Sequence, residues 1–479
     1  MVLSLSLIAD KIQGELKGPD RRFDGIFTTL GNASEGDIVI RHWIDDNGVR
    51  MGLEKGIAAI ITTDPRGGAL EAAKDSGIPI ILVDRIEFAN AFALRWTIKK
   101  FAPETKRIVV TGTNGKSTTT HMIYHILKSS GREAYTNTDS KSEFNNLIDP
   151  VVPAQIAEEA KGKELEYLVI EVSEVQGWLG RVMEDHAYLM TRAIDPEVVV
   201  ITNVALDHIG LVNSIEEAYW EVSGAVRAMN RGVAVLNYED ERVRSMADLN
   251  EKIESFFYGN RSSVSYRDDG IYIDDELLLL KDYMPFKSRH FIQNTLAAIA
   301  ACISLKLPLE DIKAGVSSYK PLDRRFSIIH EDPLIIDDFA HNPDGIKATI
   351  ESAAAMDGRL WIVCAIRGSR GKEINIANAK ALAKTIKDID YKLIVTDSCD
   401  VVDDLNIVKD HERRAFLRVL KEHGIKYTHH RKLEDALTEA LNKASKDDII
   451  LLIGAQGMDP ATTLLEKILK KGVRVTGQC

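Results

Sequence analysis

The sequence is poor in cysteine, has no excess of positive charge and contains no long apolar run. Its four cysteines (Cys302, Cys364, Cys399 and Cys479) show none of the paired spacings that chelate zinc or build a disulfide framework. The formal net charge of −11, from 61 basic and 72 acidic residues, disfavours a nucleic-acid partner because such a chain repels a phosphate backbone. These absences exclude a disulfide scaffold and a polybasic binding protein, and favour a reducing compartment.

Apolar runs are also short. The longest, such as 57–61 and 449–453, fall far below the roughly 20 residues that a membrane-spanning helix needs. The apolar start of the chain runs into Asp10 and Lys11 without a basic segment or a small-residue cleavage site, so we expect no signal peptide. We therefore expect a cytoplasmic protein that does not contact a membrane.

What the chain does contain is ordinary for a soluble globular protein: 45% hydrophobic and 28% charged residues. Short β-branched runs alternate with amphipathic helical stretches, which predicts an α/β fold of mostly parallel sheets covered by helices. The expected buried strands are 58–62, 78–83, 107–111, 167–172, 198–202, 360–364, 392–396 and 449–453.

The length of 479 residues predicts roughly three domains. Residues 101–106 contain a proline and several charges between a helix expected at 88–100 and a new strand. Residues 317–325 follow an alanine-rich helix expected at 294–305 in the same way. We therefore divide the chain into domains at 1–104, 105–318 and 319–479.

The most informative segment lies at 107–120, where a strand, a glycine loop and a helix follow one another. The loop and first helical residues are Thr111, Gly112, Thr113, Asn114, Gly115, Lys116, Ser117 and Thr118. Glycines allow backbone N–H groups to point at a phosphate, the lysine adds a mobile charge, and the serine hydroxyl can coordinate a magnesium ion. The loop is a shortened form of the usual pattern, because Val110 stands five residues before Gly115. It predicts an ATP-binding site.

Polar residues follow two further expected strands. Glu171 ends the apolar run 167–170, and Asp207 and His208 follow the strand at 198–202. Because open α/β sheets bind ligands at the carboxyl ends of their strands, Glu171 is a candidate magnesium ligand, and Asp207 and His208 form a second polar pair at a strand exit. A glutamate that faces solvent and a structural histidine remain the alternatives.

Together these residues resemble the Mur ligases, the family that joins amino acids to UDP-linked peptidoglycan precursors and includes the folylpolyglutamate and cyanophycin synthetases. The motifs that carry the resemblance, in family order, are 111–117, Glu171-Val-Ser173, Thr202-Asn203 with Asp207-His208, Asn294 and 338–343. Segments 33–39, 56–61 and 78–83 resemble, more weakly, the first domain of the E-type and F-type ligases.

The resemblance implies three domains: a small α/β domain for the UDP-linked substrate, a central ATPase domain, and a Rossmann-like C-terminal domain that brings the amino acid. It also implies that Lys116 binds the phosphates, and that Ser117, Glu171 and His208, directly or through water, arrange Mg²⁺. Lys116, Glu171 and His208 would then carry the catalysis. Asn294, Arg325, Asp338 and His341 would bind the nucleotide. The expected partners are a UDP-linked peptide precursor and a free amino acid, and we expect a monomer.

The chain departs from the family in several places. Most members carry a carbamylated lysine about fifteen residues after the aspartate of the Asp-His pair, but Val222 stands there, and no lysine occurs between Lys163 and Lys252. Either other groups hold a second metal, with Glu216, Glu217 and Glu221 as candidates, or one ion suffices. The three glutamates are alternatively a solvated helix face.

Two other departures concern the substrates. Asp397-Ser-Cys-Asp400 replaces the signature of the diaminopimelate ligases, and 29–31 replaces the family's uridine-contacting trio.

The sequence thus predicts an ATP-dependent ligase that forms an amide through an acyl phosphate. A divergent ligase of archaeal pseudomurein synthesis is one interpretation, although the residues do not separate it from a bacterial cell-wall enzyme. A ligase acting on a tetrapyrrole carboxylate, as in coenzyme F430 assembly, is an alternative. So is a nucleotide-gated protein that hydrolyses ATP without joining substrates.

Overall fold

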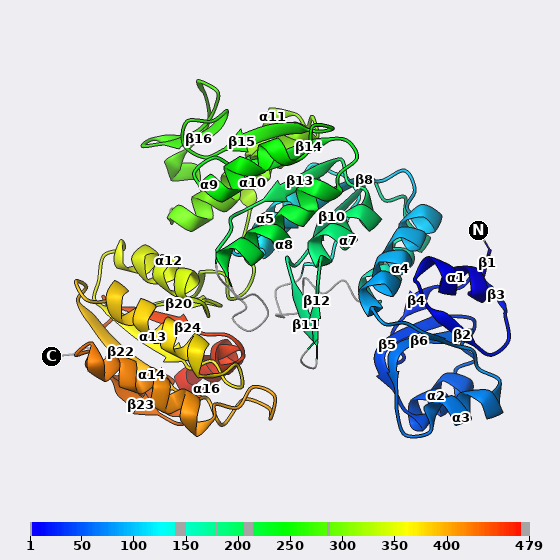
Figure 1. The fold of residues 1–479 in the computed structure, drawn as a ribbon. Helices are drawn as coiled ribbons and strands as arrows, with labels where there is room; N and C mark the ends of the chain where they lie inside the picture. Colours follow the sequence, from blue (N-terminus) through cyan, green and yellow to red (C-terminus); the bar gives the residue numbers. More distant parts are fainter. Residues whose placement is uncertain (1, 139–149, 179–180, 206–213, 285–287, 471–479) are drawn as a thin grey trace. The chain divides into compact units, whose positions relative to one another are not determined.

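The computed structural model describes residues 2–138, 150–178, 181–205, 214–284 and 288–470. The chain divides into two compact units whose main boundary lies between Tyr319 and Lys320. Most of the described strands pair in parallel, so the predicted α/β class is confirmed (Figure 1). Among the described residues, no helix has the length and apolar character that crossing a bilayer requires.

The first unit begins with a five-stranded sheet in the order β2-β7-β6-β5-β4. Helices α1 and α4 pack on one face of this sheet, and α2 and α3 pack on the other. The elements are β1 (Leu3–Ser4), α1 (Leu5–Lys11), β2 (Glu15–Lys17), β3 (Arg22–Phe23), β4 (Phe27–Thr28), β5 (Ile38–Ile44), α2 (Asp46–Glu54), β6 (Ala59–Pro65), α3 (Ala69–Ser76), β7 (Ile80–Leu82) and α4 (Ile86–Phe101).

Helix α4 joins this sheet to the next part of the same unit. Ala89 and Ala93 belong to the core of the N-terminal sheet, whereas Leu94 and Ile98, on another side of the helix, belong to the core of the central sheet. Because one helix supplies residues to both cores, the break that we expect near residue 104 separates two sheets that share a packed helix.

The central sheet has nine strands in the order β18-β17-β16-β15-β14-β13-β8-β10-β9. All pairs from β9 to β16 are parallel, and β17 and β18 extend the sheet as an antiparallel edge. Its strands are β8 (Lys106–Thr111), β9 (Ala134–Thr136), β10 (Tyr167–Glu171), β13 (Val198–Ile201), β14 (Val233–Asn237), β15 (Glu254–Tyr258), β16 (Val264–Arg267), β17 (Gly270–Ile273) and β18 (Glu276–Leu280), and a separate antiparallel pair is formed by β11 (Gln176–Trp178) and β12 (Arg181–Met183).

Helices cover the parallel part of this sheet. Side chains from α4, α6, α7 and α8 form one core with Val109 of β8, Leu168 of β10 and Val199 of β13, whereas α5 packs against β8, β9, β10 and helix α11. The helices are α5 (Lys116–Ser129), α6 (Val151–Gly162), α7 (His186–Ile194), α8 (Ile215–Ala228), α9 (Glu241–Ser245), η1 (Met246–Leu249), η2 (Lys281–Tyr283), α10 (Arg289–Ser304) and α11 (Leu309–Ser318).

The second unit is built on a six-stranded sheet in the order β19-β20-β24-β21-β22-β23, parallel except for β19. Helices α12, α13 and α14 cover one face and α15 and α16 the other, as expected for a Rossmann-like layer arrangement. The elements are β19 (Ser327–Glu331), β20 (Leu334–Asp338), α12 (Pro343–Ala354), β21 (Leu360–Ala365), α13 (Lys372–Thr385), β22 (Tyr391–Thr396), α14 (Asp410–Glu422), β23 (Thr428–His430), α15 (Leu433–Lys443), β24 (Ile449–Ile453), η3 (Gln456–Met458) and α16 (Ala461–Lys470).

Candidate functional site

The glycine loop between β8 and α5 requires both of its glycines. Gly112 has φ +127°, and a Cβ there would lie 2.2 Å from Thr202 Oγ1. Gly115 has φ +83°, and a Cβ there would lie 2.2 Å from the side-chain oxygen of Asn294 on α10. Any larger residue would therefore combine a strained backbone with a clash. Asn294, one of the predicted nucleotide contacts, lies directly against the loop.

The loop is anchored to the end of β13. Asn203 accepts from the Thr113 N–H through its backbone oxygen at 3.0 Å and from the Asn114 N–H through its side-chain oxygen at 2.9 Å. Its side-chain amide donates to the Asn114 carbonyl at 2.8 Å. The Thr113 hydroxyl bonds both backbone groups of Ala205. Asn203 belongs to one of the quoted motifs, but sequence reasoning assigned it no role, because its partners Thr113 and Asn114 are 90 and 89 residues away along the chain.

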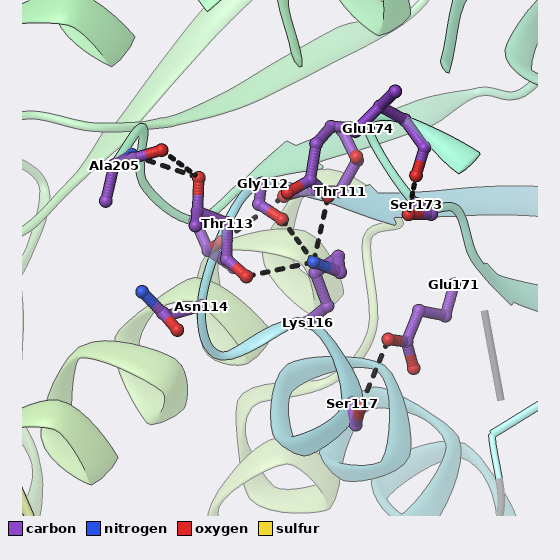
Figure 2. Close-up of polar contacts among 12 residues, drawn as sticks. Thr111, Gly112, Thr113, Asn114, Lys116, Ser117, Glu171, Ser173, Glu174 and Ala205 are labelled. Carbon is purple, nitrogen blue, oxygen red and sulfur yellow. Dashed lines mark hydrogen bonds and ion pairs between the residues drawn. The ribbon is translucent and has the colours of Figure 1, made fainter. Parts of the chain in front are cut away.

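Lys116 begins α5 and folds back over the loop (Figure 2). Its ammonium donates to the Gly112 carbonyl at 2.6 Å, to the Thr113 carbonyl at 2.9 Å and to a Glu174 carboxylate oxygen at 3.0 Å. Both side chains of this ion pair are buried, with exposed fractions of 8% for Lys116 and 3% for Glu174. Glu174 is a residue that sequence reasoning missed, and its only local signal is a position three residues after Glu171.

Ser117 and Glu171 form a second buried pair. The Ser117 hydroxyl donates to one carboxylate oxygen of Glu171 at 3.0 Å, and Thr138 donates to the other at 2.8 Å. The side chain of Asn137 bonds both backbone groups of Glu171, at 2.8 and 3.0 Å. Glu171 is therefore held with its carboxylate inside the protein, and the alternative of a strand-end glutamate that faces solvent is wrong.

These oxygens fit a magnesium ion. Mg²⁺ is commonly bound by one or two protein oxygens, with substrate phosphates and water completing its octahedron. The hydroxyl of Ser117 and the carboxylate of Glu171 supply such oxygens beside the phosphate loop. In the part of the chain that the structure describes, no group of three or more His, Cys, Asp or Glu residues could hold a metal. An ion completed by phosphate oxygens and water fits these two protein oxygens.

The remaining predicted metal ligand, His208, lies outside the described residues, as does Asp207. Of the three glutamates that were candidates for a second metal, Glu216 and Glu217 are exposed on α8, as a solvated helix face would be. Glu221 is different, because burial raises its pKa to about 7 and its carboxylate accepts from the Asp185 N–H at 3.4 Å.

A fully buried histidine contacts the segment 171–174, which begins with the last residue of β10 and carries Glu171 and Glu174. His186 begins α7, and its Nδ1 lies 2.8 Å from the carbonyl oxygen of Ser173. Burial lowers the pKa of His186 to about 4, against opposing effects of the Ser173 carbonyl and Glu174. The imidazole is therefore neutral at pH 7, and Nδ1 carries the proton that it donates to Ser173.

The other three predicted nucleotide contacts belong to the second unit. Arg325 lies with its guanidinium carbon 5.2 Å from the ring centre of Phe339, and the His341 ring lies 5.0 Å from the same ring. Asp338 ends β20 and accepts from the Ala340 N–H and the Thr349 hydroxyl, both at 2.9 Å. Phe339 thus gathers Arg325 and His341 at the carboxyl end of a parallel strand.

Comparison with known proteins identifies the family. Residues 110–302 match the Mur ligase middle domain, and residues 324–456 match a domain described as Mur ligase, glutamate ligase domain. The UDP-N-acetylmuramate–L-alanine ligase of Sulfurihydrogenibium sp. is 26% identical over 376 residues, 76% of each chain. The UDP-N-acetylmuramoyl-L-alanyl-D-glutamate–2,6-diaminopimelate ligase of Bacillus velezensis is 24% identical over 432 residues, 84% of this chain and 82% of the relative.

Solved structures share the fold. MurF from Acinetobacter baumannii superposes with a TM-score of 0.73 at 19% identity, covering 98% of this chain and 99% of that one. A pseudomurein peptide ligase type C from Methanothermus fervidus gives a TM-score of 0.58 at 20% identity, covering 89% of this chain and 100% of that one. Two consecutive domain matches, together with relatives that align along most of the chain, show that this protein belongs to the Mur ligase family of ATP-dependent, amide-forming ligases.

Proposed function

We propose that the protein uses ATP and Mg²⁺ to join an amino acid to the carboxylate of a UDP-linked cell-wall peptide precursor. The observation that carries this proposal is the pairing of Lys116 and Ser117, at the start of α5, with buried carboxylates beside the glycine loop. Both relatives act, by their names, on UDP-linked substrates and add an amino acid.

In this proposal the three predicted domains divide the work. Residues 1–104 bind the UDP-linked precursor, 105–318 bind ATP, and 319–479 position the amino acid. The loop at 111–118 holds the phosphates, and Asn294, which touches Gly115, holds the adenosine side of the same loop. Arg325, Asp338 and His341 complete the nucleotide site when the C-terminal domain closes.

The chemistry follows from the poor leaving group of a carboxylate. A carboxylate oxygen attacks the γ-phosphorus of ATP, the bond from that phosphorus to the bridging oxygen breaks, and ADP leaves. The amine then attacks the acyl carbon, the carbon–oxygen bond to phosphate breaks, and the nitrogen loses a proton.

Lys116, once it exchanges one of its protein partners for the nucleotide, balances the charge on the phosphate oxygens during transfer. Ser117 and Glu171, with His208, would hold the Mg²⁺, which supplies charge neutralisation between the phosphates. A closed C-terminal domain would keep water away from the acyl phosphate until the amine arrives.

We further propose a pseudomurein-type precursor as the substrate. The absence of lysine between Lys163 and Lys252 and the sequence Asp397-Ser-Cys-Asp400 set the chain apart from the bacterial enzymes that add diaminopimelate. The fold shared with the pseudomurein peptide ligase of Methanothermus fervidus supports the same interpretation.

The test is phosphate release from MgATP with UDP-linked glutamyl or muramyl precursors and each of the twenty amino acids in turn. We expect release with one amino acid only, and a product heavier than the precursor by that amino acid minus water. Lys116→Ala should abolish both signals. Lys128→Ala, a half-exposed lysine on the same helix that pairs with Glu133, is the matched control and should change neither.

Other outcomes are equally informative. Release that requires a tetrapyrrole carboxylate instead of a UDP-linked precursor would move the substrate to that class. Release that needs no amino acid would contradict ligation.

A further inference from the structure

The ammonium group of Lys116 has no spare donor in this structure. A lysine carries three N–H donors, and three protein acceptors lie at 2.6, 2.9 and 3.0 Å from Nζ. To bind a phosphate oxygen directly, Lys116 must give up or share at least one of these bonds. The proposed function therefore includes an exchange of partners at this lysine.

The three acceptors differ in how easily they can release the Lys116 ammonium. The carbonyls of Gly112 and Thr113 belong to the loop backbone, which Asn203 holds from the end of β13. The Glu174 carboxylate stands at the end of a rotatable side chain on the segment after β10. It also carries a negative charge, which an arriving phosphate repels, whereas the neutral carbonyls are much less affected. Glu174 is therefore the partner that Lys116 releases when a phosphate binds.

The ion pair is also needed when no phosphate is bound. A buried ammonium without a counter-charge is costly, and losing one partner of a buried pair is strongly destabilising. Glu174 supplies that counter-charge from within the protein. The same segment, 171–174, supplies Glu171 to Ser117, so the first two residues of α5 are each paired with a carboxylate of this segment.

We propose that Glu174 is an exchangeable counter-ion that competes with the nucleotide phosphates for Lys116. It is a positioning residue: it keeps the lysine charged and folded over the loop, it weakens nucleotide binding, and it speeds the release of ADP by taking the lysine back. This inference rests on the proposed function, because it requires Lys116 to bind phosphate.

The experiment compares MgADP binding by isothermal titration calorimetry in the wild-type protein and in Glu174→Gln, which keeps the shape and an acceptor oxygen but removes the charge. We expect the dissociation constant for MgADP to fall about tenfold, which corresponds to about 1.4 kcal/mol. In stopped-flow displacement the ADP off-rate should fall in proportion. Glu158→Gln, an exposed glutamate paired with Lys161, is the control and should change neither.

Two further variants distinguish competition for Lys116 from a general repulsion between Glu174 and ADP. Glu174→Asp keeps the negative charge but shortens the side chain, so its affinity should lie between those of the wild type and Glu174→Gln. In a Lys116→Ala background, Glu174→Gln should tighten ADP binding clearly less than in the wild type. The lysine for which Glu174 and the phosphates compete is then absent. An equal gain in both backgrounds would show that Glu174 acts by general repulsion and would overturn the proposal.

The outcomes separate this inference from the proposed function. If the wild type binds no MgADP, or if Lys116→Ala binds it as tightly as the wild type, the proposed nucleotide site is wrong. If Lys116→Ala weakens binding but Glu174→Gln leaves the affinity unchanged or lower, with only a loss of thermal stability, Glu174 is a structural residue. In that case only the counter-ion proposal falls.

Discussion

Two loops in this protein have the same sequence pattern and opposite surroundings. Gly112-Thr-Asn-Gly-Lys-Ser117 follows β8 and opens α5, and Gly368-Ser-Arg-Gly-Lys-Glu373 follows β21 and opens α13. Both strands are buried and pair in parallel with their neighbours, and both helices begin without a side-chain cap. By sequence pattern alone, each loop is a candidate for binding an anion.

The second loop already holds an anion of its own. The N–H groups of Ser369, Arg370 and Gly371 donate to the carboxylate of Glu412 at 3.1, 2.9 and 2.6 Å. The Lys409 N–H donates to the same group at 2.9 Å, and Glu412 is fully buried. Here the lysine of the pattern, Lys372, is 62% exposed and lies 3.7 Å from Glu373.

The difference teaches how a glycine loop becomes a phosphate site. In the second loop a fixed carboxylate on a neighbouring helix satisfies the amides, so the loop is structural. In the first loop the carboxylate of Glu174 pairs with the lysine, whereas loop amides bond the oxygens of Asn203. A side chain that pairs with a lysine can exchange for a phosphate, but one that caps several backbone amides at once is much harder to displace.

The largest expected effect is that of removing Lys116, with the equivalent lysine of the second loop, Lys372, as the comparison. Lys116→Ala should lower kcat/KM for ATP on the order of 10³-fold, because a fixed charge beside the transferring phosphoryl group is lost. Lys372→Ala should leave kcat/KM unchanged. The measurement is amino-acid-dependent phosphate release by each purified variant. Equal losses in both variants would show that the two loops are not functionally distinct.

Removing the internal anion should affect stability and spare nucleotide binding. Glu412→Ala leaves the amides of the second loop without their acceptor inside the protein, and we expect a cost of about 3 kcal/mol. The loss should appear as faster hydrogen exchange at 366–372, with the affinity for MgADP unchanged. Glu373→Gln, which changes an exposed glutamate, is the control. Protection that is retained in Glu412→Ala would mean that another group caps the loop.

The smallest expected effect is a difference in acid stability. The folded-state pKa of His186 is lowered to about 4 from an ordinary 6.5, so the unfolded chain takes up a proton between these values and the folded protein does not. This contribution favours folding less and less as the pH falls through that window. Asp337 in the second unit changes stability with pH in the opposite direction. Burial raises the pKa of its carboxyl to about 6, although Arg324 opposes the shift, so its contribution to folding becomes more favourable as the pH falls below that value.

A variant isolates the contribution of His186. Between pH 7 and pH 5, the loss of unfolding free energy should be about 2 kcal/mol smaller in His186→Gln than in the wild type. The glutamine amide can still donate to the Ser173 carbonyl. The measurement is urea-dependent hydrogen exchange of peptides from 105–319 at both pH values. Parallel pH profiles in the two proteins would show that His186 is not the buried base responsible.

Much of the fold could be predicted because its signals are local. Each expected buried strand begins within two residues of an observed one, as at Lys106 for β8 and Tyr391 for β22, because short β-branched runs in a parallel sheet are buried on both faces. The edge strands β16, β17 and β18 were not predicted. Each is only four or five residues long, and although β18 contains four consecutive leucines, its place in the sheet depends on pairing with β17.

The sequence by itself determined the α/β class, the phosphate loop and the candidates Lys116, Ser117 and Glu171, because glycine tolerance, strand burial and helix starts depend on residues close together in the chain. Tertiary structure alone decided that Glu174 pairs with Lys116, that Asn203 anchors the loop and that Glu412 fills the second loop. These partners are 58, 89 and 41 to 43 residues apart, respectively. A hydrogen bond or an ion pair across such a separation depends on where the packed sheets and helices bring the two groups, and no local pattern encodes it.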